Sequence, residues 1–397
     1  MVNLVRLASL HPMQPIYLDY NSTAPIDPRV TDAMVACHRE GYVNPASQHR
    51  MGQAARRKLE SLRSEIIDML GGENSGVHAD RLIFTSGGTE SNNLALLGLA
   101  LDNTGNPVGR VLVSAVEHPS ILGAADCLRR RGVTVDVIPV DQDGVVKLDE
   151  LECAIDQPAM LVSVMAVNNE TGVVQPIQQV VGLCKAKSIL IHTDAVQAVA
   201  KMPVRFSELG VDAMTLTAHK LHGPRGIGGL LVKHSVALNP IVFGGFQQMG
   251  VRPGTEDVAL VAGFHRALQL YHEEAGSRLQ QMEKLRDLLQ MRVLRDCPGV
   301  FVVGSEACRT PNCLNVSFPG IDRQAFLMAA DMQGLAISTG SACASGSSDP
   351  SHVLLAMGLD RGTTEGSIRL SLSHRSTVRE INLAADRIAL IYKDLQR

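Results

Sequence analysis

The sequence predicts an α/β protein with two domains, a larger one built on a mostly parallel central sheet and a smaller α+β one. Short apolar runs rich in β-branched residues recur between residues 80 and 235, as expected of strands buried on both faces. Helical patterns separate most of these runs, which is typical of a parallel sheet. The length of 397 residues is enough for about two or three domains.

The expected strands of the larger domain follow one another with helices between most of them. They are Arg81–Phe84, Val111–Val113, Val135–Val140, Met160–Val167, Ile189–Ile191, Ala213–Leu216 and Gly228–Val232. The clearest helical patterns among them are Ser91–Leu101 and Ile121–Arg131. Because parallel strands end at one edge of the sheet, residues that follow them are candidates for a ligand site.

A long helical pattern over Thr255–Leu294 leads out of this region and marks a plausible domain boundary. We therefore expect a large domain over 28–272, a small domain from 16–27 and 273–397, and an N-terminal extension over 1–15. The expected elements of the small domain are strands at Val300–Val303, Leu314–Phe318 and Ile368–Leu372 and a closing helix at Val378–Leu395.

Composition excludes several classes of protein. Apolar residues make up 45% of the chain and charged residues 19%, so a sizeable core can form. The net charge is −3 and no basic stripe is present, so no nucleic-acid partner is indicated. No apolar run approaches the roughly 18 residues that span a bilayer, and the first ten residues do not resemble a secretory signal. We expect a cytoplasmic protein without a membrane partner.

The eight cysteines are scattered along the chain without framework spacing and without a CxxC pair. This distribution predicts free thiols in a reducing compartment. Cys308 and Cys313 are the closest pair, but they lack two further ligands nearby, so no metal site is expected.

Lys220 carries the most information about function. It follows the expected strand Ala213–Leu216, and a glycine-rich stretch comes after it. A lysine at a crowded strand end can be partly desolvated, which keeps its amine neutral and suited to Schiff-base chemistry. A solvated surface lysine is the alternative for an isolated residue.

The segment Thr85–Asn93 follows an expected strand and opens a helix. Gly87 and Gly88 would let the backbone approach an anion, and the helix N-terminus would offer free N–H groups, with Thr89 adding a hydroxyl. It contains neither GxGxxG nor a Walker loop, so a nucleotide-binding Rossmann protein is disfavoured. An ordinary glycine turn is the alternative.

Two further strand ends carry polar residues. Asp194 follows Ile189–Ile191 and could keep the pyridine nitrogen of pyridoxal 5′-phosphate (PLP) protonated, although an N-cap is the common alternative. Gln197 lies close enough to reach the same ligand. His118 follows Val111–Val113 and could stack on a cofactor ring; a loop histidine before a proline is the alternative.

Three residues are candidates for contact with a substrate. Asn169 ends another strand and is either a turn residue or a polar contact. Arg369 lies in a strand-like run, where its planar group would suit a carboxylate if it faces a cleft. Cys343 lies among small polar residues, which predicts an exposed and reactive thiol.

Taken in order, these motifs resemble those of NifS/IscS-type cysteine desulfurases, which are PLP enzymes of the class V aminotransferase fold (fold type I). The resemblance covers about residues 16 to 390. The motifs that carry it are Tyr17–Asn21, Asn44–His49, Thr85–Asn92, Glu117-His118, Val167–Gly172, Asp194–Gln197, Ala218–Lys220, Arg252–Thr255 and Gly340–Cys343. The longer Ser/Gly-rich segment after Cys343 is similar to the subgroup with a mobile cysteine loop.

The resemblance implies a role for each matching residue. Lys220 would bind PLP through a Schiff base and move the Cα proton of L-cysteine, and Cys343 would take the sulfur as a persulfide, releasing L-alanine. Asn169 and Arg369 would hold the substrate carboxylate. The cofactor contacts would come from Gly88, Thr89, His118, Asp194, Gln197, Thr217, His219 and, on the neighbouring subunit's phosphate, Thr255.

The resemblance also implies a homodimer and a protein that accepts the sulfur, such as an iron–sulfur scaffold. The sequence leaves the pathway and the preference for cysteine or selenocysteine open. The alternatives are a selenocysteine lyase, a PLP aminotransferase that would not need Cys343, and a non-catalytic scaffold that would not bind PLP. The retained lysine, aspartate and thiol argue against the scaffold.

Overall fold

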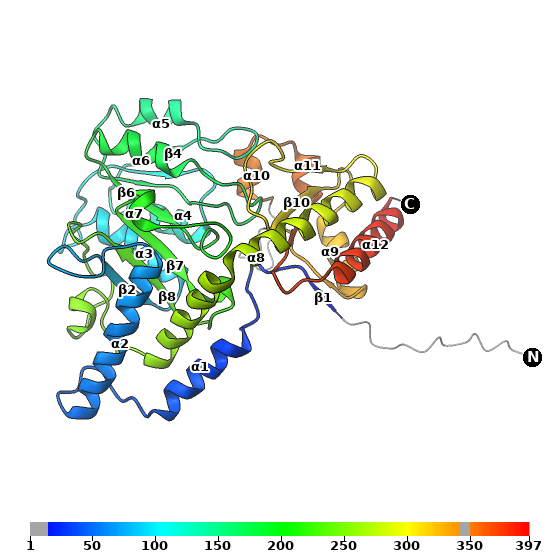
Figure 1. Ribbon diagram of the computed structural model, residues 1–397. Coiled ribbons are helices and arrows are strands. Elements are labelled where there is room, and N and C mark those ends of the chain that lie inside the picture. The colour runs from blue at the N-terminus through cyan, green and yellow to red at the C-terminus, as the bar shows by residue number, and fades with distance from the viewer. Residues whose placement is uncertain (1–14, 341–349, 397) are drawn as a thin grey trace, which may run out of the picture.

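The computed structural model describes residues 15–340 and 350–396. Its larger unit contains a seven-stranded sheet flanked by helices (Figure 1). The strands, in spatial order, are β2 (Arg81–Thr85), β8 (Gly228–Val232), β7 (Ala213–Thr217), β6 (Leu190–Asp194), β5 (Leu161–Ser163), β3 (Val111–Ser114) and β4 (Val135–Ile138).

The mostly parallel sheet predicted from the sequence is confirmed, and β8 alone of the seven strands runs in the opposite direction. The connection from β7 to β8 contains only a 3-10 turn, η1 (Ala218–Leu221). It is too short for the crossover that a parallel pair requires, so the chain reverses beside β7. This reversal holds Lys220 at the edge where the parallel strands end.

Helices of the larger unit cover both faces of the sheet. They are α1 (Pro28–Arg39), α2 (Arg50–Met69), α3 (Gly88–Ala100), α4 (Pro119–Arg130), α5 (Leu148–Ala154), α6 (Ile177–Lys185) and α7 (Phe206–Leu209), with a 3-10 turn η2 at Gln247–Gly250.

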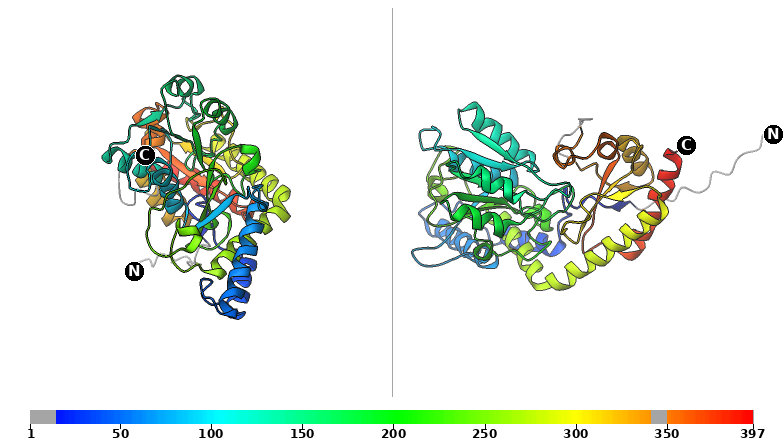
Figure 2. Two further views of the ribbon diagram at one scale, coloured as in Figure 1. Left: turned by 90° about the vertical axis from the view of Figure 1, so that its left-hand side faces the viewer. Right: turned by 90° about the horizontal axis from the view of Figure 1, so that it is seen from above.

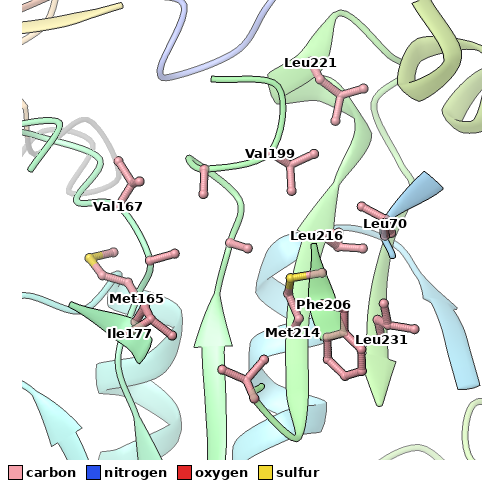
Figure 3. Close-up of a cluster of buried hydrophobic side chains, with 14 of the residues drawn as sticks. Leu70, Met165, Val167, Ile177, Val199, Phe206, Met214, Leu216, Leu221 and Leu231 are labelled. Carbon is pink, nitrogen blue, oxygen red and sulfur yellow. The ribbon is translucent and has the colours of Figure 1, made fainter. Parts of the chain in front are cut away.

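Alternate side chains of each strand enter different layers of the core. Met214 and Leu231 join the cluster that contains Phe206, part of which is drawn in Figure 3. Their neighbours Ala213 and Leu230 join the cluster beneath α3 and α4 instead. Both faces of β7 and β8 are therefore buried, which explains their continuous apolar sequences.

The smaller unit has its own apolar cluster and two small sheets. Its strands are β1 (Ile16–Tyr17), parallel to β11 (Leu335–Ala336), and β12 (Ser367–Ser371), which pairs with β10 (Cys313–Ser317), itself next to β9 (Phe301–Val302). Its helices are α9 (Arg323–Met332), α10 (His352–Ala356), α11 (Arg361–Glu365) and α12 (Val378–Leu395).

One continuous helix, α8 (Val258–Asp296), joins the two units (Figure 2). Asp257 caps its N-terminus by accepting from the N–H groups of Ala259 and Leu260. It packs against α1 and α2 in the larger unit and against α12 in the smaller one. The domain boundary predicted at 272/273 falls inside this helix, and the division stays a prediction.

Residues 16–24, here called the crossing segment, also connect the units. Leu18 exchanges backbone hydrogen bonds with the smaller unit, donating to Ala336 O (2.8 Å) and accepting from Ser371 N (2.7 Å). Ala24 N donates to His219 O in the larger unit, at 2.9 Å. The crossing segment thus places Asn21 between both units.

Candidate functional site

A pocket of ≈ 250 Å³ lies where β2, β3, β5, β6 and β7 end. Its lining residues are Asn21, Ser22, Gly88, Thr89, Asn92, His118, Met165, Asn169, Asp194, Val196, Gln197, Thr217, His219, Lys220, Gly340 and Arg369. Six of these, Gly88, Thr89, His118, Asp194, Thr217 and Lys220, are called the strand-end wall below. The parallel strands bring them together because their carboxyl ends share one edge.

The N-terminus of α3 forms one end of the pocket. α3 begins at Gly88, three residues before the predicted start at Ser91. A Cβ on Gly88 would lie 3.0 Å from Val196 Cγ2, and a Cβ on Gly228 would lie 2.7 Å from the backbone of Gly87. Close backbone packing therefore requires glycine here. The first-turn N–H groups of α3 give this end of the pocket a preference for an anion.

Asp194 is fixed at the base of the pocket. Its Oδ1 accepts from Val196 N (2.9 Å) and its Oδ2 accepts from Asn92 Nδ2 (2.7 Å). Asn92 also donates to Ser120 Oγ at 2.9 Å. Since Asp194 makes no ion pair with a described residue, its charge is available to a cationic nitrogen in the pocket.

His118 serves as the N-cap of α4 and also lines the pocket. Its Nδ1 accepts from Ser120 N at 3.1 Å and lies 2.7 Å from Ser120 Oγ. Burial lowers the pKa of the His118 imidazole, so the ring is neutral near pH 7. Because Nδ1 accepts from the backbone, we assign the remaining ring proton to Nε2.

Lys220 projects into the pocket from η1. Its Nζ donates to Asn21 O (2.6 Å) and to Ser22 O. The neighbouring His219 has a pKa lowered to about 4, first by burial and then by the charge of Lys220. Lys220 therefore faces a neutral imidazole and two carbonyl groups.

Arg369 and Asn169 close the opposite side. Arg369 is only 2% exposed, and its Nη2 forms an ion pair with Asp19 Oδ1 at 2.7 Å. Its Nη1 donates to Asn169 O at 3.0 Å. Arg369 Nε and Asn169 Oδ1 are buried without a partner among the described residues. Buried polar atoms are usually satisfied, so these two atoms indicate a polar ligand.

Thr255 is a predicted site residue that does not line this pocket, and Cys343 is one that the structure does not describe. Thr255 lies at pockets beside α1 and the start of α8 and does not line the main one. Cys343 lies outside the described residues, so its predicted role stays a prediction.

Several residues of the site were missed from the sequence. Asp19 and Asn21 were only part of a motif, and Asn92 was read as part of the glycine turn. Lys201 carried no signal, because no expected strand ends beside it. It is 5% exposed, and its Nζ donates to Asn21 Oδ1 (3.0 Å) and to Gln197 Oε1. Residues 176 or more positions away from Asn21 meet it here, and local sequence cannot show such contacts.

The comparisons with known proteins agree with this geometry. The model of the family described as "Aminotransferase class-V" matches residues 16–383. The chain belongs to this family of enzymes. Within it, the chain falls with the NifS/IscS-like cysteine desulfurases, as its sequence relatives indicate.

Cysteine desulfurase IscS of Dictyoglomus turgidum is 36% identical over 383 residues, covering 96% of this chain and 95% of the relative. Cysteine desulfurase IscS of Proteus mirabilis is 40% identical over 380 residues, covering 94% and 92%. The solved structure of a NifS-like protein from Rickettsia africae has a TM-score of 0.86 and 33% identity, covering 96% of this chain and all of the solved one. Among the described residues, no helix is both long and apolar enough to cross a membrane.

Proposed function

We propose that the protein is a cysteine desulfurase that uses PLP to convert L-cysteine to L-alanine and passes the sulfur to Cys343. The observation that carries the proposal is that Lys220, Asp194 and the Gly88–Thr89 turn line one pocket. These groups match an aldehyde, a pyridine nitrogen and a phosphate, respectively, and family membership supports the same cofactor.

The residues present fit PLP. Gly88, Thr89, Thr217 and His219 would hold the phosphate, since they surround the N-terminus of α3. Asp194 would hold the pyridine nitrogen, and Gln197 the ring oxygen. His118, neutral because of burial, would stack on the ring. When bound, PLP supplies an electron-withdrawing ring that stabilises negative charge at the substrate Cα.

The chain's own residues would perform the remaining tasks. Arg369, whose Nε is unpartnered among the described residues, and the side-chain amide of Asn169 would hold the carboxylate of L-cysteine. The amine of Lys220 would move the proton at Cα. The thiolate of Cys343 would attack the substrate sulfur. The C–S bond breaks, an S–S bond forms, and the products are L-alanine and a Cys343 persulfide.

We further propose a homodimer that delivers sulfur to an acceptor protein in the cytoplasm, such as an iron–sulfur scaffold. The loop before η2 exposes apolar side chains, with Phe243 81% and Phe246 96% exposed. Exposed aromatic groups of this kind are typical of an interface. In such a dimer Thr255, which lies outside its own subunit's pocket, would reach the partner's phosphate.

The test is a single turnover of the purified protein with PLP and L-cysteine and without reductant. We expect about one L-alanine per subunit and a persulfide on Cys343 by peptide mass spectrometry. The Cys343→Ala variant should bind PLP and form no persulfide and no L-alanine. If wild type binds no PLP, or if Cys343→Ala turns over at the wild-type rate, the proposal is wrong.

The same assay separates the related activities. Faster turnover of selenocysteine than of cysteine would favour a selenocysteine lyase. Transfer of the amino group to a keto acid, independent of Cys343, would favour an aminotransferase. Light scattering of the wild type and of Phe246→Ser tests the dimer, which the serine variant should weaken.

A further inference from the structure

Lys201 is a buried lysine that the proposed reaction does not use. It is 5% exposed and lies at the end of the turn that follows β6. Among the residues that the structure describes, no carboxylate lies within ion-pair distance of its amine. A buried lysine is costly unless its amine is satisfied, so its two acceptors, Asn21 Oδ1 and Gln197 Oε1, identify its role.

These two contacts determine how the Gln197 amide is oriented. The carbonyl oxygen of Asn21 can only accept, so the Gln197 atom that faces it must be the amide nitrogen, and the Gln197 oxygen is left to accept from Lys201. The Nε2 group then lies on the other side and donates one N–H to Asn21 O at 2.9 Å. An NH2 group has two N–H donors, and Gln197 lines the pocket, so the second is left for a ligand.

Asn21 is held in one orientation by the same network. Its Oδ1 accepts from both Lys201 and Asn312 Nδ2 (2.9 Å), and its Nδ2 donates to Asn169 O (3.2 Å). Its backbone oxygen accepts from Gln197 and from Lys220 Nζ. Turning either amide over would place donor against donor, so the network has one satisfied arrangement.

We propose that Lys201 is a positioning residue whose amine binds the side-chain oxygen of Gln197, so that Gln197 presents an N–H donor to the cofactor's ring oxygen. This proposal rests on PLP being the ligand of the pocket. Lys201 itself is not among the lining residues of the pocket, so it would act on the cofactor through Gln197.

The charge state of Lys201 supports this role. Burial, followed by the charge of Lys220, lowers the pKa of the Lys201 amine to about 7. The other groups that act on its pKa are Cys313, which raises it, and Arg369, which lowers it, while Lys201 in turn lowers the pKa of His219. A neutral amine has two N–H groups, which matches its two acceptors. Lys201 can therefore orient Gln197 without placing a permanent second charge beside Lys220.

The first measurement is a pH titration of the visible absorption of the PLP-loaded protein. The pH at the midpoint of the absorption change is compared among wild type, Lys201→Met and Lys201→Arg. A donor to the ring oxygen stabilises its negative charge and so lowers the midpoint. Lys201→Met should raise the midpoint by about one unit and weaken PLP binding about tenfold. Lys201→Arg retains a donor and should leave the midpoint at or below the wild-type value. Lys187→Met, at an exposed lysine, is the matched control.

A double-mutant cycle separates positioning from general packing. Gln197→Leu should raise the midpoint as Lys201→Met does, and the two changes together should add nothing further. An unchanged midpoint in Lys201→Met, or fully additive shifts, would overturn the proposal. If Lys201→Met does not fold, the other two variants decide. A raised midpoint in Gln197→Leu together with an unchanged midpoint in Lys201→Arg supports the proposal. An unchanged midpoint in Gln197→Leu overturns the proposal.

A second readout needs no cofactor. Between about pH 7 and 10 the unfolded chain keeps the Lys201 proton and the folded chain does not, so the stability of wild type relative to Lys201→Met should rise with pH. If this rise occurs but PLP does not bind, the proposed function fails while the buried network stands. If PLP binds and the rise is absent, the amine is not held as described and the positioning proposal fails.

Discussion

The strand-end wall and the crossing segment face each other across one pocket but are built differently. The wall consists of residues that each end or follow a strand of one mostly parallel sheet, so neighbouring strands place them. The crossing segment is held in place from the smaller unit, where β11 and β12 bond to it. We infer that the larger unit alone can position the residues of the wall. The residues of the crossing segment, in contrast, are positioned only when the two units are in contact.

The largest effect expected is at the wall. Lys220→Ala should reduce L-alanine formation at least ~10³-fold, because it removes the group that moves the Cα proton. Its free energy of unfolding should fall less than that of a crossing-segment variant. Turnover assays and urea unfolding, with Lys187→Ala as the exposed control, measure both. If the Lys220→Ala variant keeps its activity, Lys220 is not the group that moves the Cα proton.

The crossing segment should respond in stability as well as activity. Asp19→Ala leaves the buried Arg369 without its carboxylate, so the free energy of unfolding should fall by about 3 kcal/mol. The Michaelis constant for L-cysteine should rise too, because Arg369 loses its orientation. Asp156→Ala breaks the exposed pair with Lys187 and should change stability by less than about 0.5 kcal/mol. If Asp19→Ala and Asp156→Ala are equally stable, the crossing segment does not contribute to stability as described.

A moderate effect is expected behind the wall. Asn92→Ala removes the donor to Asp194 and to Ser120, and PLP affinity should fall about tenfold because a hydrogen bond to a charged group is lost. Fluorescence titration of the cofactor-free protein measures the affinity. Asn93→Ala is the neighbouring control, since Asn93 donates to Thr89 O and does not line the pocket. Equal losses in both would show only a disturbed helix.

The last effect is expected at Glu117, next to His118, and it appears only as the pH rises. Burial raises the pKa of its carboxyl to about 8, so the folded protein holds this proton at pH 7 and the unfolded chain does not. Stability from this group is therefore lost as pH rises from about 5 to 8. Glu117→Gln should match wild type near pH 5 and be the more stable of the two near pH 8. Urea midpoints that keep the same difference at both pH values would contradict this.

The wall could be predicted from the sequence because each member lies shortly after the end of an apolar run. Element ends were less accurate: β5 stops at Ser163, whereas the apolar run continues to Val167, because its pairing with β3 and β6 ends there. The pairs Asp19–Arg369 and Asn21–Lys201 could not be predicted, since 350 and 180 positions separate their members. Neither the loop of Cys343 nor the domain division is tested by the structure.

The position of Asn21 has a consequence for biosynthesis. Its backbone N–H bonds to Ser371 Oγ at 2.9 Å, so it waits during translation for a residue that is made 350 positions later. The seven-stranded sheet, complete by residue 232, can assemble earlier on the ribosome, because domains fold as they emerge. The nascent chain therefore forms its wall before its crossing segment docks, so Asn21 can hold the Gln197 amide in place only after β12 has been made.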